Sequence, residues 1–214
     1  MKIGIIADVH ANFRALEAVL AEMGPVEMLC CAGDITGYYH DINEVIEVLR
    51  DAGCVMILGN HDYYLVGNMV RHPNPLVARS LQYTRRNISA ENLALLGRLP
   101  VTRSLSVDGL TIRMFHGSPW NPLEHYLYPD SDDLDRLAEV EADVIILGHT
   151  HYPFGKEIGG KLVINPGSVG QGRPAGRLPS YAILQTGSRQ AELHYVDSAA
   201  VVLTGTDGQD GAVI

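Results

Sequence analysis

Three things are scarce in this chain of 214 residues: cysteine, long apolar runs and positive charge. The three cysteines, Cys30, Cys31 and Cys54, lie inside apolar runs, so we expect buried thiols in a reducing compartment and no disulfide framework. No apolar run reaches the roughly 20 residues of a membrane span, and the first residues have a strand pattern with no signal-peptide features. We therefore expect a cytoplasmic protein with no membrane partner.

Negative charge exceeds positive charge: 16 lysines and arginines stand against 25 aspartates and glutamates, for a formal net charge of −9. An extended nucleic-acid surface needs a basic stripe, so we expect none. A small phosphorylated substrate remains compatible with this charge, because bound divalent cations would reverse its sign locally.

The composition is that of a folded domain. With 46% hydrophobic and 19% charged residues, the chain can bury one sizeable core. We expect a single domain over residues 1–204 and a flexible tail over the polar, Gly-rich residues 205–214.

The first third of the chain alternates strand and helix patterns. Apolar runs at 2–7, 26–32 and 55–58 predict buried strands, and helical spacing predicts helices over 11–23 and 42–51. Strands joined by helices in this way are expected to be parallel.

Residues 63–100 have no strand pattern and predict a helical insertion, with helices at about 75–86 and 89–96. The insertion either packs against the edge of a sheet or partly covers a functional site, and the sequence leaves both open.

From residue 102 the pattern changes mostly to hairpins. Turn sequences at 108–109, 159–160 and 187–188 separate short apolar runs, Ser131 precedes a helical pattern, and 144–147 reads as a buried strand. The whole pattern predicts an α+β or α/β fold in which two packed mixed β-sheets form a sandwich flanked by helices.

Polar side chains of similar chemistry follow five of the predicted strands. They are Asp8 and His10, Asp34, Asn60, His116, and His149 and His151. The carboxyl ends of strands converge on one crevice in α/β sheets, so we expect these side chains to lie together. Each alone has a structural explanation, such as a turn or a helix cap, but five such blocks make coincidence a poor explanation.

Imidazole, carboxylate and amide oxygen are ligands for divalent transition metals. Seven of them exceed the four that a tetrahedral zinc site needs. They match two ions about 3.5–4 Å apart that share one carboxylate. Asp34, from a central strand, is the candidate for the shared ligand.

The blocks read D-x-H, G-D, G-N-H-D, H-G and G-H-T-H, at 8–10, 33–34, 59–62, 116–117 and 148–151. In this order, with the closing Asn165-Pro166-Gly167-Ser168, they resemble the calcineurin-like metallophosphoesterase family, in particular its small prokaryotic phosphodiesterase-type members. The resemblance implies a two-sheet sandwich and two divalent metal ions. Manganese is our first expectation, with iron, nickel, zinc, cobalt and magnesium as alternatives.

The resemblance also implies how the ligands are shared. One ion would be held by Asp8, His10, Asp34 and His151, and the other by Asp34, Asn60, His116 and His149. It implies that His61 lies beside the ions, paired with Asp62, and these two are our candidate catalytic residues. An imidazolium there would protonate the leaving group or donate a hydrogen bond to the transition state.

The implied activity is hydrolysis of a phosphoester by a hydroxide that bridges the two ions. Protein phosphatases of this superfamily carry G-D-x-V-D-R-G, and here Tyr38 stands in place of that arginine. A small phosphodiester is therefore the first expectation. Phosphomonoesterase and dinucleoside polyphosphate hydrolase are alternatives, and a catalytically silent protein-binding scaffold is a weaker one because all seven ligand positions are filled.

Substrate contacts are less sharply defined by the sequence. Asn12 either binds a phosphate oxygen or caps the first helix, Tyr38 is a candidate for stacking on an aromatic group, and Arg173 is a candidate phosphate contact. A homo-oligomer is compatible with the apolar strand edges.

Overall fold

The computed structural model describes residues 1–67, 69, 72–173 and 178–196. Its first sheet has five strands in the order β10 (Gln190–Tyr195), β9 (Ser180–Gln185), β1 (Lys2–Ile6), β2 (Met28–Cys31) and β3 (Val55–Met56). β1, β2 and β3 are parallel, as predicted. β9 returns from the far end of the chain and pairs antiparallel with β1, so that Gly4 lies opposite Ile183.

The second sheet also has five strands, in the order β4 (Thr102–Val107), β5 (Leu110–Phe115), β6 (Val144–Ile146), β8 (Lys161–Asn165) and β7 (Phe154–Ile158). The predicted hairpins β4–β5 and β7–β8 are present. The third predicted hairpin, β9–β10, lies in the first sheet, so the expectation of mostly hairpins is confirmed, whereas β5, β6 and β8 at the centre of the second sheet are parallel. The long connection from β5 to β6 gives the chain room to cross over.

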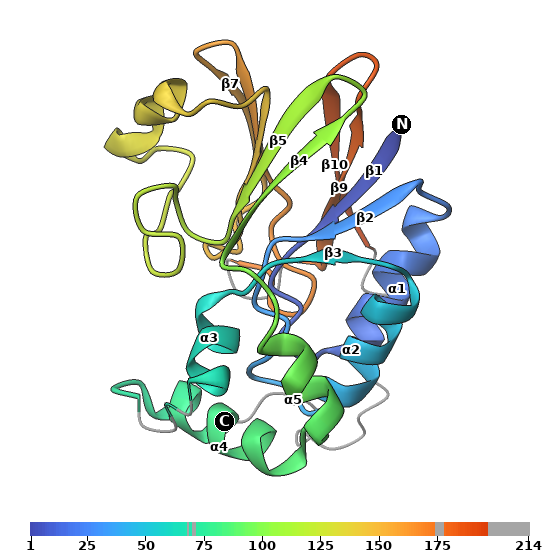
Figure 1. Ribbon diagram of the computed structural model, residues 1–214, viewed down its shortest axis with the longest axis vertical. Coiled ribbons are helices and arrows are strands. Elements are labelled where there is room, and N and C mark those ends of the chain that lie inside the picture. Colours follow the sequence, from blue (N-terminus) through green and yellow to red (C-terminus); the bar gives the residue numbers. More distant parts are fainter. Residues whose placement is uncertain (68, 70–71, 174–177, 197–214) are drawn as a thin grey trace.

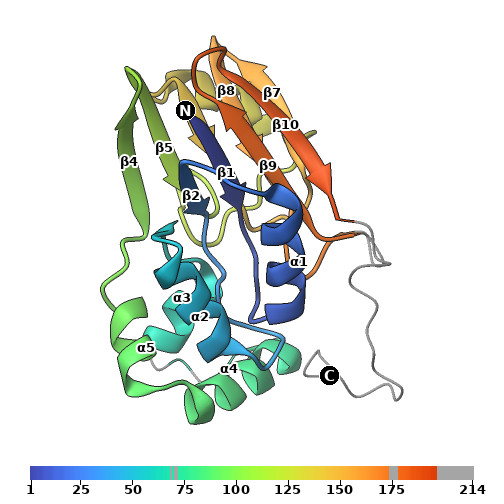
Figure 2. The same ribbon diagram turned by 90° about the vertical axis from the view of Figure 1, so that its right-hand side faces the viewer.

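The two mixed sheets pack face to face with helices outside them, as expected (Figures 1 and 2). The five α-helices of the described part are α1 (Phe13–Met23), α2 (Ile42–Asp51), α3 (Asn60–Val66), α4 (Pro75–Asn87) and α5 (Ala90–Leu96). The layer between the sheets is fully apolar, with Ile5, Ile112 and Ile146 completely buried. α1 and α2 cover the outer face of the first sheet through residues such as Leu16 and Ile46.

The outer face of the second sheet is covered by a 3-10 helix, η1 (Asp132–Glu139), and the loop before it. Leu134 and Leu137 of η1 are buried there, as the helical spacing predicts. The helix is a 3-10 helix and not an α-helix. Ser131, which was expected to cap it, makes no side-chain cap bond to η1, and its hydroxyl accepts a hydrogen bond from the Tyr128 N–H (2.8 Å).

The expected helical insertion is present, but it begins earlier than residue 63, because α3 begins at Asn60 inside a ligand block. Ser89 caps α5 by accepting from the Asn92 N–H (3.1 Å). α4 and α5 pack against α2 and α3, with Val77, Leu81 and Leu96 buried in the same core as α1. The helices α3, α4 and α5 of the insertion gather beyond the carboxyl ends of β1, β2 and β3 (Figure 1).

The composition led to predictions about the three cysteines and about the C-terminal tail. Cys30, Cys31 and Cys54 are free and buried, as expected. The tail at 205–214 lies outside the described residues, so its flexibility and the domain boundary at 204 stay predictions.

Within the part of the chain that the structure describes, none of the helices is both long enough and apolar enough to cross a membrane.

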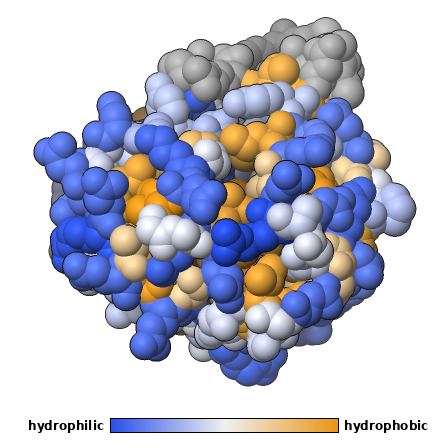
Figure 3. Space-filling model, turned by 90° about the horizontal axis from the view of Figure 1, so that it is seen from above, coloured by the Kyte–Doolittle hydropathy of each residue, from blue (hydrophilic) through white to orange (hydrophobic). Residues whose placement is uncertain are grey.

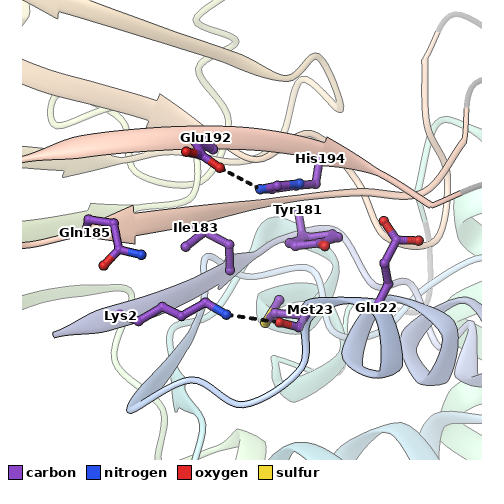
Figure 4. A pocket seen from close by; sticks show the side chains of 8 residues that line it. All are labelled: Lys2, Glu22, Met23, Tyr181, Ile183, Gln185, Glu192 and His194. Atoms are coloured by element: carbon purple, nitrogen blue, oxygen red, sulfur yellow. Dashed lines mark hydrogen bonds and ion pairs between the residues drawn. The ribbon is translucent and has the colours of Figure 1, made fainter.

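Two surface features lie away from the carboxyl ends of the central strands. At the end of the sandwich seen in Figure 3, apolar side chains show between polar ones. The partly buried Leu105, Leu110 and Leu193 pack against the inter-sheet core. A hollow of about 360 Å³ lies on the outer face of the first sheet, where the Tyr181 ring is parallel to that of His194 (Figure 4).

Candidate metal centre

The structure brings the seven predicted ligands together at the carboxyl ends of the strands. The loops after β1, β2, β5 and β6 carry six of them, and the seventh, Asn60, is the first residue of α3, just after the loop that follows β3. In the order of these loops they are Asp8 and His10, Asp34, Asn60, His116, and His149 and His151, and all seven side chains are buried.

The first of two ligand clusters joins the two sheets. It consists of Asp8, His10 and His151, whose ligand atoms lie within 4.8 Å of one another. His151 Nε2 lies 3.2 Å from Asp8 Oδ1 and 3.1 Å from His10 Nε2.

The second cluster consists of Asp34, His116 and His149, with Asn60 beside them. His116 Nε2 lies 3.4 Å from Asp34 Oδ2 and 3.2 Å from Asn60 Oδ1. The same Asp34 Oδ2 lies 3.9 Å from His10 Nε2, so this carboxylate oxygen stands between the two clusters.

The histidine rings are held in the form that binds metal. Backbone carbonyls accept a hydrogen bond from the Nδ1 atom of His10 (3.0 Å), His116 (2.8 Å) and His151 (2.7 Å). Because a carbonyl only accepts, each Nδ1 carries a proton, so Nε2 is the ring atom left to bind a metal ion. Two such Nε2 atoms, of His10 and His151, cannot hydrogen-bond to each other, whereas a cation satisfies both.

Of the buried side-chain atoms that have no hydrogen-bond partner among the described residues, two belong to the ligand clusters. They are Asp8 Oδ1 and His149 Nε2, each in one of the clusters. Buried polar atoms are nearly always satisfied, so orphans at these positions indicate a missing partner of positive charge. The donor set therefore fits divalent metal ions.

The charges of the site agree with this assignment. Burial lowers the pKa of His149 to about 3 and lowers that of His10 well below its usual value, which leaves both rings neutral. Burial lowers the pKa of His116 too, but the Asp34 carboxylate more than offsets this effect and raises the pKa to about 10. Burial raises the pKa of Asp34, and the charge of His116 outweighs it and lowers that pKa well below its usual value. Asp34 thus attracts positive charge to the second cluster.

The ligand loops have an unusual backbone. Five of the seven ligands have a positive φ: Asp8 (54°), His10 (53°), Asp34 (50°), His149 (67°) and His151 (59°). This region of φ is sparsely populated by residues other than glycine, and its strain typically gathers at functional sites. The surrounding hydrogen bonds must therefore hold these turns in place.

Both carboxylates take part in holding the turns. Asp8 Oδ2 accepts from the His149 N–H (3.0 Å), and Asp34 Oδ1 accepts from the His61 N–H (2.9 Å). Each carboxylate therefore fixes a neighbouring loop with one oxygen and faces its cluster with the other.

The closing turn at 165–168 supports the same loops. The Ser168 hydroxyl donates to the Asp8 carbonyl (2.8 Å), and Asn165 Nδ2 donates to the Gly148 carbonyl (2.7 Å). This part of the family motif thus positions ligands without being one.

His61 lies beside the clusters as expected, but it is not paired with Asp62. The Asp62 carboxylate accepts three backbone N–H bonds, from Ile35 (3.1 Å), Thr36 (2.8 Å) and Gly59 (3.0 Å). It ties the loop after β2 to the start of α3, so its observed contacts are structural. Within the described residues His61 Nδ1 has no hydrogen-bond partner, and the ring is also within ligand distance of His10 and Asp34.

The candidate substrate contacts have different surroundings. Asn12 caps α1 by accepting from the Ala15 N–H (3.1 Å), so the second of its two expected roles is the one formed. The Tyr38 ring lies against His10 (ring centroids 4.7 Å apart) and His61 (5.0 Å). Arg173 is near enough to Tyr38 for its charge to lower the pKa of that phenol, against the raising effect of burial. A direct role of Asn12, Tyr38 or Arg173 in substrate binding stays a prediction.

Three residues of the site have no counterpart in the sequence prediction. The Tyr126 ring stacks on His149 (3.8 Å, 27°). The Tyr64 hydroxyl donates to the Glu124 carboxylate and is hydrogen-bonded to the Asn60 side chain. The Glu124 backbone in turn hydrogen-bonds to His149. Tyr126 and Glu124 lie in an irregular loop, where no periodicity marks a side chain as part of a site.

A family model described as the calcineurin-like phosphoesterase superfamily domain matches residues 1–189. The chain belongs to this superfamily, as its motifs predict, and it is a metal-dependent phosphoesterase.

Two relatives show how far the likeness extends. An uncharacterized protein of Methanocaldococcus jannaschii is 33% identical over 215 residues, which cover 91% of this chain and 87% of that protein. A probable metallophosphoesterase of Methanothermobacter thermautotrophicus is 31% identical over 172 residues, which cover 78% and 77%.

Solved structures confirm the fold. A metallophosphoesterase from Sphaerobacter thermophilus has a TM-score of 0.80 at 31% identity, covering 92% of this chain and 88% of that one. A hypothetical protein from Pyrococcus horikoshii has a TM-score of 0.83 with the same coverage, and at 21% identity it supports the fold alone.

Proposed function

We propose that this protein hydrolyses small phosphodiesters with the help of two divalent metal ions, manganese being the first candidate. The observation that carries the proposal is the position of Asp34 Oδ2, which lies 3.9 Å from His10 Nε2 of one cluster and 3.4 Å from His116 Nε2 of the other. A carboxylate oxygen shared in this way is what a pair of ions requires.

When bound, such a pair supplies a hydroxide nucleophile at neutral pH and neutralises charge on the phosphoryl oxygens. The chain's own residues hold the ions and shape the space around them. His10, His116 and His151 present Nε2 because their Nδ1 atoms are fixed by backbone carbonyls. Burial of all seven ligands keeps bulk water from competing for the site.

His61 is our candidate for a role beyond ligand binding. Its backbone N–H is held by Asp34 and its ring lies 5.0 Å from that of His10. From this position the ring can donate a hydrogen bond or a proton to the leaving oxygen. Asp62 supports this role indirectly, since its carboxylate holds the loop after β2 against the start of α3, where His61 lies.

The preference for a diester is supported by Tyr38. A phosphate dianion attracts an arginine, whereas burial raises the pKa of the Tyr38 phenol and keeps it neutral. A neutral ring against His10 and His61 suits a second ester group better than a second negative charge.

Phosphomonoester hydrolysis is the second candidate, because Arg173 is close enough to Tyr38 to influence its pKa and would bind a dianion. Hydrolysis of dinucleoside polyphosphates would use the same residues as hydrolysis of other phosphoesters. A catalytically silent scaffold would not need the complete set of ligand residues. Neither has an observation in its favour here.

The decisive experiment compares bis-p-nitrophenyl phosphate with p-nitrophenyl phosphate. Metal-stripped protein would be given Mn²⁺, Ni²⁺, Zn²⁺ or Mg²⁺ in turn, with Asp34→Asn as the control that removes the shared ligand. We expect metal-dependent cleavage with the diester faster. A faster monoester would favour phosphatase activity, and no turnover despite two bound ions would favour the scaffold.

A further inference from the structure

Each ligand cluster has one tyrosine ring against it. Tyr38, in the loop after β2, packs against His10 of the first cluster (ring centroids 4.7 Å apart). Tyr126, in the loop between β5 and η1, stacks on His149 of the second (3.8 Å). The two phenols also lie close to each other, since the charge of Tyr126 raises the pKa of Tyr38 and the charge of Asp34 raises the pKa of both.

Of these two rings, Tyr126 is the more exposed, since Tyr38 is partly buried. It is 45% exposed, although the histidine on which it stacks is only 4% exposed. Its ring is nearly parallel to that of Tyr128 (9°, ring centroids 6.0 Å apart), and Tyr128 meets Tyr152 edge to face (5.9 Å). A row of aromatic rings thus runs from a buried ligand to the surface.

A positive charge lies beside this row. The guanidinium of Arg173 lowers the pKa of both Tyr126 and Tyr38, against burial, which raises them. A cation near the clusters and an exposed ring beside it match the two parts of a nucleotide, its phosphate and its base.

We propose that Tyr126 is the stacking platform for a planar base, so that the substrates are phosphodiesters of nucleosides. This inference rests on the proposed function and names its substrate class. The net charge of −9 favours single nucleotide esters over long nucleic acids, which would be repelled beyond the site.

The test uses two diesters with the same leaving group, thymidine 5′-p-nitrophenyl phosphate and methyl p-nitrophenyl phosphate. In both, an oxygen from water bonds to phosphorus, the bond to p-nitrophenolate breaks, and the proton goes to solvent. The leaving group is constant, so a difference in KM reports the retained ester group. We expect wild-type protein to prefer the thymidine ester.

Tyr126→Ala should raise KM for the thymidine ester about tenfold more than KM for the methyl ester, the usual size of one lost base–aromatic stack. Tyr126→Phe should behave as wild type. Tyr195→Ala is the matched control, since Tyr195 is equally exposed (44%) on the distant strand β10.

Several results would overturn the inference. An equal effect on both esters would show that Tyr126 only supports His149, and no effect on either would remove it from the site. Binding of thymidine 5′-monophosphate, measured by calorimetry on metal-loaded protein, gives a readout without turnover. If no ester is cleaved, the proposed function fails, but loss of this binding in Tyr126→Ala would still support the stack; binding that does not depend on Tyr126 would refute it.

Discussion

The reactivity of the site is decided at single side chains by the partner of each polar atom. His10, His116 and His151 are alike in that a backbone carbonyl accepts a hydrogen bond from their Nδ1. His61 differs, because none of the described residues bonds to its Nδ1. A ring with a free nitrogen beside the two ligand clusters can exchange protons with a substrate, which the fixed rings cannot do.

His61→Ala should therefore keep its bound metal and lose roughly 10²–10⁴-fold in turnover, the usual contribution of a general acid. Turnover on a diester with a poor leaving group, together with metal content by mass spectrometry, checks both halves. If one ion is lost, His61 is a ligand through its contact with His10 and Asp34. Near-normal turnover would remove it from catalysis altogether.

Tyr64 acts through two candidate ligands of the second cluster. Its hydroxyl joins the Asn60 amide to Glu124, and the Glu124 backbone holds His149, so one phenol supports two groups of the second cluster. The bond also decides which end of the amide faces the metal, since only the Nδ2 end can donate to a phenol oxygen.

Tyr64→Phe should weaken metal binding at the second ligand cluster about tenfold, the lower end for loss of such a partner, and leave the first cluster unchanged. Competition titration with a chelating dye resolves the two affinities. Tyr63→Phe is the control, because Tyr63 directly precedes Tyr64 in α3 and is 46% exposed. Two unchanged affinities would show that Asn60 orients itself without help.

Among the elements, the start of α3 and the loop after β2 behave as one unit. Asp62 accepts from Ile35 and Thr36 of the loop and from Gly59 at the helix N-cap. Gly59 itself lies so close to Asp34 that a Cβ there would collide with the Asp34 N and Oδ1 atoms. The glycine of G-N-H-D is thus required by close approach of two chain segments.

Gly59→Ala should destabilise the protein by about 3 kcal/mol, the upper end for overpacking, because backbone atoms cannot move aside as a side chain can. Chemical denaturation measures the free energy of unfolding. Gly155→Ala on β7 is the control, since a Cβ there meets nothing within 4 Å and should cost little. Equal stability of the two variants would show that the loop after β2 can relax.

Across the whole molecule, the ligands join segments that are far apart in the chain. Asp8 follows β1 of the first sheet and His151 follows β6 of the second, yet Oδ1 and Nε2 of these residues are 3.2 Å apart. An ion bound there links the two sheets and relieves the unpaired polar atoms, so it binds the folded state and not the unfolded chain.

Metal removal should therefore lower the melting temperature. At one hundred times the Kd a ligand adds about 2.7 kcal/mol to the free energy of unfolding. In a chain of this size that corresponds to a shift of about 5–10 °C. Calorimetry with and without a chelator measures it, and Asp34→Asn should respond less. A melting temperature that ignores metal would mean that the unfolded chain binds the ions as well.

The ligand set and most elements could be predicted from the sequence because they are local. An apolar run followed at once by aspartate or histidine specifies both a strand and what its carboxyl end carries. Asp108-Gly109 specifies a turn through the φ values that these residues accept, and the hairpin β4–β5 follows.

Only the tertiary structure decided which strands pair and what surrounds the ligands. β9 lies beside β1 although some 180 residues separate Gly4 from Ile183, and β5, β6 and β8 are parallel because of crossovers that no turn sequence announces. Asp62 binds backbone groups where a pair with His61 was expected, and Tyr126 reaches His149 from an irregular loop. Such contacts depend on packing between distant segments, and periodicity along the chain carries no record of them.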